Sequence, residues 1–129
     1  MEAKRLEHVA LFSTLSKKEL EQLAQWTDEV NVPEGEELAT QGKFAHEFFV
    51  IEDGAAEVRK DGETIGELGP GDFFGEIGLL ETDRRTASVV ATTPMTVIVM
   101  AQREFASMEH DMPGVADRIR AAIRARLSP

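Results

Sequence analysis

The chain has 129 residues, a length typical of one domain that buries its own core without metal or disulfide support. Its 24 acidic and 14 basic side chains give a formal net charge of -10, which repels a phosphate backbone and argues against direct DNA binding. With no cysteine, no signal-peptide pattern and no apolar stretch near the roughly 20 residues of a membrane span, the sequence argues against disulfide-dependent secretion and membrane insertion. The cytoplasm is the expected compartment.

The N-terminal segment, residues 1–27, is expected to be helical. Ser16 and Glu19 have the spacing of a capping box, in which the Ser16 hydroxyl accepts a hydrogen bond from the Glu19 amide while Glu19 reaches back to the Ser16 amide. Leu15 and Leu20 flank this cap at the positions of a hydrophobic staple. The pattern therefore predicts a helix that begins after Ser16 and buries one apolar stripe.

Residues 28–101 consist of short extended stretches separated by turns that contain glycine, proline and aspartate. The expected strands are 29–32, 37–40, 47–52, 55–60, 64–68, 87–91 and 95–101. Many short strands at nearly regular spacing are typical of a two-sheet jelly roll or barrel. The predicted fold class is therefore mainly β with flanking helices, in a single domain that spans residues 1–129.

The C-terminal segment, residues 102–129, returns to helical patterns. A helix is expected over 102–108, and a second one after Pro113 has Val115, Ile119, Ile123 and Leu127 on one face. The second helix also carries Arg118, Arg120, Arg124 and Arg126. These arginines form either a solvated face that complements the helix dipole or a contact surface for a partner or a nucleotide base.

Residues 74–89 contain the candidate binding site. A short helix is expected to begin near Glu76, and the amide hydrogens at a helix start attract anions. Arg85 follows a polar turn that can bring its guanidinium over these amides, and its planar set of donors suits a phosphodiester. The Glu76 carboxylate would repel that phosphate unless it accepts hydrogen bonds from a neighbouring sugar. The spacing therefore points to a nucleotide. The candidate ligand-binding residues are Phe74, Gly75, Glu76, Ile77, Gly78, Leu79, Arg85, Thr86, Ala87 and Ser88.

This stretch resembles the phosphate-binding cassette of the cyclic-nucleotide-binding domain family, which includes catabolite activator proteins, regulatory subunits of cAMP-dependent kinase and cyclic-nucleotide-gated channels. The match extends through Gly42, the strand end 50–54, Val58 and the turn 68–72, and it covers nearly the whole chain. The resemblance implies a jelly roll of the double-stranded β-helix type with helices at both ends. It also implies that Glu76 accepts from the ribose 2′-hydroxyl, that Arg85 pairs with the cyclic phosphate, and that the amides of Gly78 and Leu79 help to hold that phosphate.

The resemblance implies a sensor or regulatory domain that binds cAMP or cGMP. Thr86 does not decide between adenine and guanine as the preferred base. In the family, cGMP-selective kinase domains carry threonine at this place, and bacterial cAMP receptors often carry serine or threonine. The alternative is a degenerate domain that serves as a protein interaction module without nucleotide, but the intact pair of Glu76 and Arg85 favours a working site. Gly71 and Gly75 fit either a turn or a ligand contact.

Enzymatic activity is not expected. The sequence shows no nucleophile beside a base, and His8, His46 and His110 are scattered rather than clustered as in a metal-dependent enzyme of similar barrel shape. No metal or catalytic cofactor is therefore expected.

The chain ends at Pro129, before the point where catabolite activators extend the last helix into a dimerisation coil and a helix-turn-helix. The expected partners are a cyclic mononucleotide and a regulated protein, with neither DNA nor a membrane.

Overall fold

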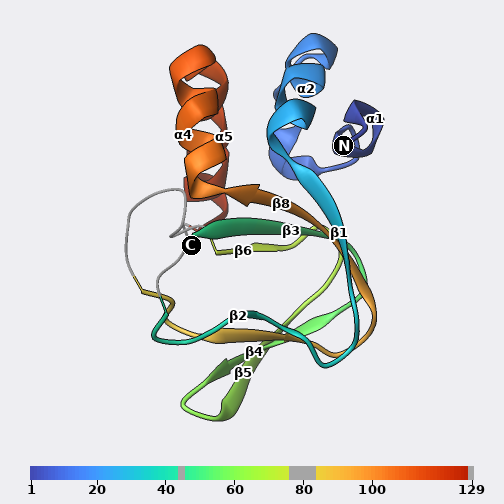
Figure 1. The fold of residues 1–129 in the computed structure, drawn as a ribbon, viewed down its shortest axis with the longest axis vertical. Helices are drawn as coiled ribbons and strands as arrows, with labels where there is room; N and C mark the ends of the chain where they lie inside the picture. Colours follow the sequence, from blue (N-terminus) through green and yellow to red (C-terminus); the bar gives the residue numbers. More distant parts are fainter. Residues whose placement is uncertain (44–45, 76–83, 128–129) are drawn as a thin grey trace.

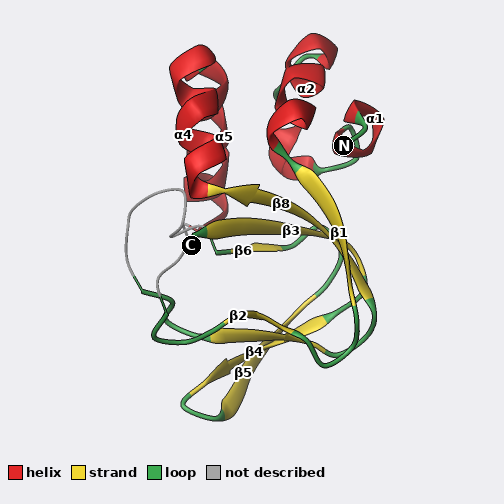
Figure 2. Ribbon diagram, viewed as in Figure 1, coloured by secondary structure: helices red, strands yellow, loops and turns green. Residues whose placement is uncertain are grey.

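The computed structural model describes residues 1–43, 46–75 and 84–127. The helices are α1 (Ala3–Leu6), α2 (Lys17–Leu23), α4 (Gln102–Asp111) and α5 (Pro113–Leu127), with 3₁₀ turns at Ala10–Phe12 and Ala24–Trp26. The strands are β1 (Asp28–Val32), β2 (Glu37–Ala39), β3 (Glu47–Asp53), β4 (Ala56–Lys60), β5 (Glu63–Leu68), β6 (Phe73–Phe74), β7 (Ser88–Ala91) and β8 (Met95–Ala101). The strands form the body of the molecule, and the N-terminal and C-terminal helices lie together at one end of it (Figures 1 and 2).

The described strands form two four-stranded antiparallel sheets. The first sheet has the order β1-β8-β3-β6 and the second has the order β2-β7-β4-β5. Successive strands repeatedly change sheet, as β1 and β2 do, which is how a jelly roll winds its chain. In the first sheet Phe49 of β3 lies opposite Val99 on one side and Phe74 on the other. This register places an aromatic pair at the end of β6, where the candidate site begins.

The first sheet is buried on both faces. Side chains alternate along β3, so Phe48 and Val50 pack against the helices while Phe49 and Ile51 pack against the second sheet. A strand covered on both faces needs apolar residues at successive positions, which explains the unbroken apolar run of β3. The fold therefore has two cores, one between the sheets and one between the first sheet and the helices.

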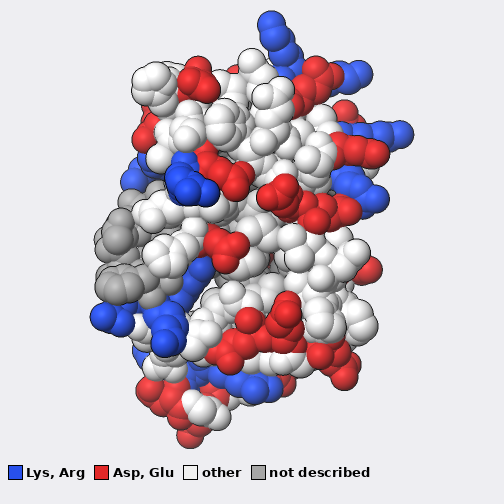
Figure 3. Space-filling model, viewed as in Figure 1, with Lys and Arg blue, Asp and Glu red and all other residues white. Residues whose placement is uncertain are grey.

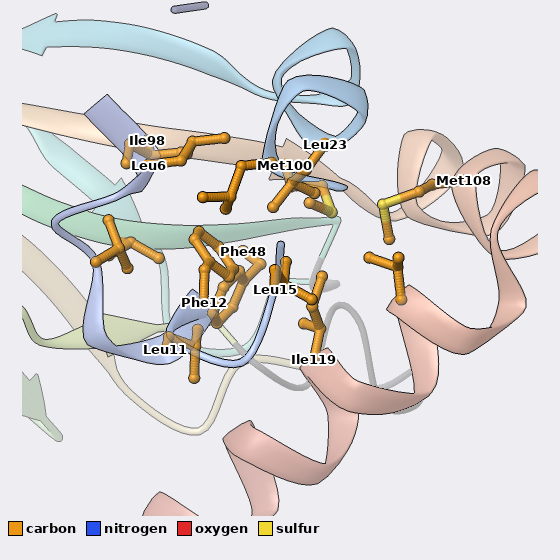
Figure 4. Close-up of a cluster of buried hydrophobic side chains, with 14 of the residues drawn as sticks. Leu6, Leu11, Phe12, Leu15, Leu23, Phe48, Ile98, Met100, Met108 and Ile119 are labelled. Atoms are coloured by element: carbon orange, nitrogen blue, oxygen red, sulfur yellow. The ribbon is translucent and has the colours of Figure 1, made fainter. Parts of the chain in front are cut away.

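The helical core joins the two ends of the chain. Ile119 and Ile123 of α5 are 1% and 0% exposed and belong to the same buried cluster as Leu6 and Leu23. Figure 4 shows side chains from the N-terminal segment, the first sheet and the C-terminal helices converging in this cluster. The predicted apolar face of the last helix is thus confirmed at its described side chains, while the side chain of Leu127 lies outside the description.

The N-terminus of α2 is closed by the expected capping box. The Ser16 amide donates to Glu19 Oε1 at 2.9 Å, and the Glu19 amide donates to Ser16 Oγ at 3.1 Å. Leu15 and Leu20, the predicted staple residues, are both buried in the helical core. These reciprocal bonds satisfy two backbone donors that a helix start otherwise leaves open.

The predicted fold class, mainly β with flanking helices in a two-sheet jelly roll, is confirmed. In the described residues the two sheets remain separate rather than closing into a barrel. The sequence did not indicate β6, because a strand of two residues is too short to show an alternating pattern. It also gave no bounds for α1 or the first 3₁₀ turn, whose four and three residues are too short for a helical period.

Candidate functional site

Two chain segments meet at one end of the roll to form the candidate site. One is the end of β6 with Gly75, and the other is the stretch from Arg84 that leads into β7. Between them lies a pocket of about 240 Å³. Its lining residues are Ala39, Val58, Leu68, Phe73, Phe74, Gly75, Arg85, Thr86, Ala87 and Val89. Among the described residues, the pocket therefore has mostly apolar walls with one cationic side chain.

Arg85 is a buried cation, with only 9% of its surface exposed. Its Nη2 donates to the backbone carbonyl of Glu47 at 2.8 Å, and its Cζ lies 6.0 Å from the centroid of the Phe49 ring. The Phe49 ring in turn stacks on Phe74 with centroids 4.7 Å apart and an interplanar angle of 14°. A hydrogen bond and an aromatic neighbour thus fix the guanidinium in one orientation.

Gly75 packs directly against this guanidinium. Its φ is +80°, in the left-handed region that favours glycine. A β-carbon at residue 75 would overlap Arg85 Nη1 and would lie 2.6 Å from the Glu47 carbonyl oxygen. The sequence left Gly75 open between turn geometry and ligand contact. The structure gives it a third task, which is to leave room for the guanidinium.

The backbone of Arg85 is held by the loop between β2 and β3. The Gly42 amide donates to the Arg85 carbonyl at 2.9 Å, and the Arg85 amide donates to the Lys43 carbonyl at 2.7 Å. The same loop is tied to β7, because the Gln41 amide donates to Ser88 Oγ at 2.9 Å. Arg85 is therefore fixed at both its backbone and its side chain.

The side chains of the neighbouring residues Arg84 and Arg85 have different surroundings. Arg84 is exposed, and its Nη1 donates to the Gly42 carbonyl at 2.7 Å. It does not line the pocket. Arg84 thus supports the loop from outside, while Arg85 presents its guanidinium at the pocket.

The predicted site residues fall into three groups. Phe74, Gly75, Arg85, Thr86 and Ala87 are brought together around the pocket. Ser88 is not among the lining residues, and its hydroxyl oxygen accepts the Gln41 amide. Glu76, Ile77, Gly78 and Leu79 lie outside the described residues, so their assigned roles stay predictions.

Sequence reasoning did not assign a site role to several pocket walls. Ala39, Val58, Leu68, Phe73 and Val89 line the pocket and come from five different strands. Val58 and Leu68 belong to the stretches that resemble the family, which is the one signal that pointed toward them. An apolar strand residue that faces a pocket has the same pattern as one that faces a packed core, so periodicity alone does not separate them.

Two arginines of α5, Arg118 and Arg120, contact neighbouring helices. Arg118 pairs with Glu19 of α2 through two hydrogen bonds, with Nη1 and Oε1 3.0 Å apart, and its Nη1 also donates to the Thr14 carbonyl at 3.2 Å. Arg120 pairs with Glu109 of α4, and its Cζ lies 4.9 Å from the Phe105 ring centroid. Neither arginine is among the described residues that line the pocket, and neither sequence-based interpretation of these two residues included their ion pairs. They join α5 to its neighbouring helices.

The described part of the chain has neither a cluster of metal-binding side chains nor a helix suited to a membrane. It contains no group of three or more histidine, cysteine, aspartate or glutamate side chains placed to hold a metal ion. Within the same residues, no helix combines the length and apolar character needed to cross a bilayer.

Comparison with known proteins identifies the family. The model of the cyclic nucleotide-binding domain matches residues 29–110. The chain belongs to this family. The cyclic nucleotide-binding domain described here is 37% identical over 91 residues to a cAMP-dependent protein kinase regulatory subunit of Yarrowia lipolytica, covering 70% of the chain and 24% of that protein. It is 34% identical over 124 residues to the regulatory subunit of Mycosarcoma maydis, covering 89% of the chain and 24% of that protein.

A solved structure shows the same fold along the whole domain. The putative cyclic nucleotide-binding protein of Geobacter metallireducens superposes with a TM-score of 0.82 at 23% identity, covering 99% of both chains. The likeness in fold thus extends over the strands and over the helices at both ends of the chain. The chain spans about a quarter of the length of the curated kinase regulatory subunits that it matches.

Proposed function

We propose that this cyclic nucleotide-binding domain binds cAMP or cGMP through Arg85 and acts as a regulatory sensor. The observation that carries the proposal is the burial and fixed orientation of the Arg85 guanidinium at the edge of a pocket. A planar guanidinium matches two oxygens of a phosphodiester, and such charge-assisted hydrogen bonds are stronger when water is excluded. The apolar walls contributed by Val58 and Leu68 suit the base and sugar of the same ligand.

Relatives support cAMP as the first ligand to test. The two curated proteins described above are named cAMP-dependent protein kinase regulatory subunits. In the proposal Glu76 accepts from the ribose, as the family resemblance implies. The output is a change in the surface offered to a regulated protein partner in the cytoplasm, with no catalytic step and no DNA contact by this domain.

The helices supply a route from the pocket to that output. Arg85 lies beside Glu47, and β3 carries Phe48 and Val50 into the helical core that holds α5. In the proposal, nucleotide fixes the cassette and shifts the equilibrium between two positions of α5. The degenerate alternative, an interaction module without nucleotide, is disfavoured because the domain retains a buried arginine and a glycine that makes room for it.

Titration calorimetry of the domain with cAMP and cGMP tests the proposal. Linear 5′-AMP is the matched control, since it has the same base and sugar but a phosphate monoester that carries more charge and lacks the ring. At ligand near 100 times the dissociation constant, binding should stabilise the domain by roughly 2.7 kcal/mol, a melting shift on the order of 10 °C. No heat and no melting shift with millimolar cyclic nucleotide would refute the proposal in favour of the degenerate alternative.

A further inference from the structure

A second hollow lies between the edge strands β1 and β2, where it is lined by residues other than those of the nucleotide pocket. Its volume is about 280 Å³. Its floor is apolar and consists of the buried residues Val32, Phe49 and Val97 with the half-buried Leu38 and Val99. We refer to this hollow, together with its rim, as the edge groove.

The rim of the edge groove is acidic. Asp28, Glu36, Glu37 and Glu47 line it, and all four are exposed. None of them forms an ion pair with another described residue. Figure 3 shows acidic side chains above and below a hollow near the middle of this face. Three of the carboxylates stand at the starts of β1, β2 and β3 and Glu36 directly precedes β2, so their charge is spread along the groove rather than focused at one point.

One wall of the edge groove is an open strand edge. Within the described chain β1 pairs with β8 alone, which leaves its other edge without a strand neighbour. Alternation places Asp28, Val30 and Val32 on the groove side, and Val30 is 41% exposed. An open strand edge beside exposed apolar surface is a template for an added extended chain.

We propose that the edge groove binds an extended basic segment of a partner protein, with one apolar side chain of that segment against the floor. Charge complementarity selects a cationic occupant, and the spread of four carboxylates along the groove fits several lysines or arginines better than one small amine. The open edge of β1 offers backbone hydrogen bonds that an extended peptide can complete. Nucleic acids and anionic lipid surfaces carry the wrong charge for this rim.

Fluorescence anisotropy with a labelled peptide of sequence Arg-Arg-Leu-Arg-Arg, capped at both ends, tests the proposal on the complete chain. Since the protein has a net charge of -10, the experiment must distinguish binding in the edge groove from nonspecific electrostatic attraction of the basic peptide to the whole protein. The variant Glu36→Lys/Glu37→Lys should weaken binding by about tenfold. The matched control Glu63→Lys/Glu67→Lys makes the same charge change on exposed positions of β5 and should alter binding by less than about twofold.

Two further measurements locate the apolar contact. Replacing the central leucine of the peptide by glycine keeps its charge and should weaken binding several-fold, and Val30→Thr should weaken the leucine peptide but not the glycine peptide. Amide chemical shifts should change along β1 on peptide addition.

Equal losses of affinity from the Glu36→Lys/Glu37→Lys and Glu63→Lys/Glu67→Lys variants would overturn the proposal, because binding would then be nonspecific electrostatic attraction. Self-association of the domain that is abolished by Val30→Thr would also overturn it, since the occupant would be a second copy. Unchanged melting temperatures show that each variant is folded.

Discussion

Gly75 and Arg85 are packed so closely that a side chain at residue 75 would displace the guanidinium. The φ of Gly75 is +80°, and a β-carbon there would overlap Arg85 Nη1. We therefore predict that Gly75→Ala destabilises the domain by about 1 kcal/mol or more and abolishes tight nucleotide binding. Chemical denaturation and calorimetry measure the two effects.

Gly62→Ala is the matched control for this substitution. Gly62 has a similar φ of +82°, but a β-carbon there meets no atom within 4 Å. It therefore carries the cost of left-handed backbone without the overlap. Nucleotide binding should survive in Gly62→Ala. If both variants bound nucleotide as the unmodified domain does, the packing of Gly75 would have no role in positioning Arg85.

The two neighbouring arginines should differ sharply in ligand binding. Arg85 is buried beside the pocket, whereas Arg84 is exposed and bonded to the Gly42 carbonyl. Arg85→Ala should weaken cyclic nucleotide binding by at least roughly 1.5 to 3 kcal/mol, while Arg84→Ala should change it little. Arg85→Lys keeps the charge without the planar donors and should recover part of the loss. Equal losses from the two alanine variants in calorimetry would mean that Arg85 is not the phosphate ligand.

Thr86 is predicted to read the base. Its side chain is exposed at the pocket and follows Arg85 directly. One neutral hydrogen bond to a guanine amino group contributes about 0.5 to 1.5 kcal/mol, so Thr86→Ala should weaken cGMP binding by roughly twofold to twelvefold and affect cAMP less. Thr86→Ser keeps the hydroxyl and should retain the original preference. An unchanged ratio of cAMP to cGMP affinity in Thr86→Ala would show that Thr86 does not contact the base.

Much of the fold was predictable because its signals are local. The capping box at Ser16 involves residues three apart, and the strands of the β-roll are separated by turn residues that are visible one by one. Strand β6 was not predicted, because its two residues are too few to show an alternating pattern. The order of the strands within the two sheets was not predicted either, since it depends on pairings between distant segments, such as β1 with β8.

Part of the candidate site was also predictable from a local sequence signal, whereas other contacts of the site involve residues far apart in the sequence. Gly75 and Arg85 lie within one short motif, so their association could be inferred from spacing. One partner of the Arg85 guanidinium is the backbone carbonyl of Glu47, an atom that every residue possesses and that leaves no mark in a sequence. Val58 and Leu68 reach the pocket from the second sheet, and only the three-dimensional arrangement shows that they face it.

The ion pair between Arg118 and Glu19 should make the docking of α5 sensitive to acid. Hydrogen bonds from Arg118, followed by that from the Ser16 amide, lower the pKa of Glu19 from 4.5 to about 2. A carboxyl whose pKa is lower in the folded state stabilises the fold above its unfolded pKa, and this contribution is lost as the pH falls from 4.5 toward 2. Glu19→Gln should therefore lower the melting temperature at neutral pH, by an amount that shrinks through this window.

The choice of variant isolates the charge. Glutamine at residue 19 can still form the capping box, so Glu19→Gln removes the ion pair without opening the start of α2. Arg118→Ala should give a similar pH dependence, whereas Arg103→Ala on the exposed part of α4 should leave melting nearly unchanged. A melting difference between Glu19→Gln and the unmodified domain that stays constant down to acidic pH would contradict the assignment.

Glu52 should have the opposite dependence on pH. Its side chain is 15% exposed and lies near Glu29 of β1 and Arg5 of α1, with Arg5 Nη1 at 3.7 Å. Glu52, Arg5 and His8 line one small pocket beside the N-terminal segment. Burial, followed by the neighbouring Glu29 carboxylate, raises the pKa of Glu52 from 4.5 to about 7, although Arg5 opposes the shift. A carboxyl with a raised pKa in the folded state stabilises the fold fully below pH 4.5, and the contribution is lost as the pH rises through about 7.

Glutamine at residue 52 resembles the protonated glutamate side chain. We therefore predict that Glu52→Gln has the same melting temperature as the unmodified domain near pH 4.5 and a higher melting temperature at pH 8. The gain at pH 8 should be on the order of 1 to 2 kcal/mol after allowance for solvent screening. Glu67→Gln, at an exposed position of β5, should give no such dependence. Thermal denaturation across this range measures the difference directly. If Glu52→Gln shifted melting equally at every pH, the carboxyl would be ionised throughout, and the Arg5 ion pair would outweigh both burial and Glu29.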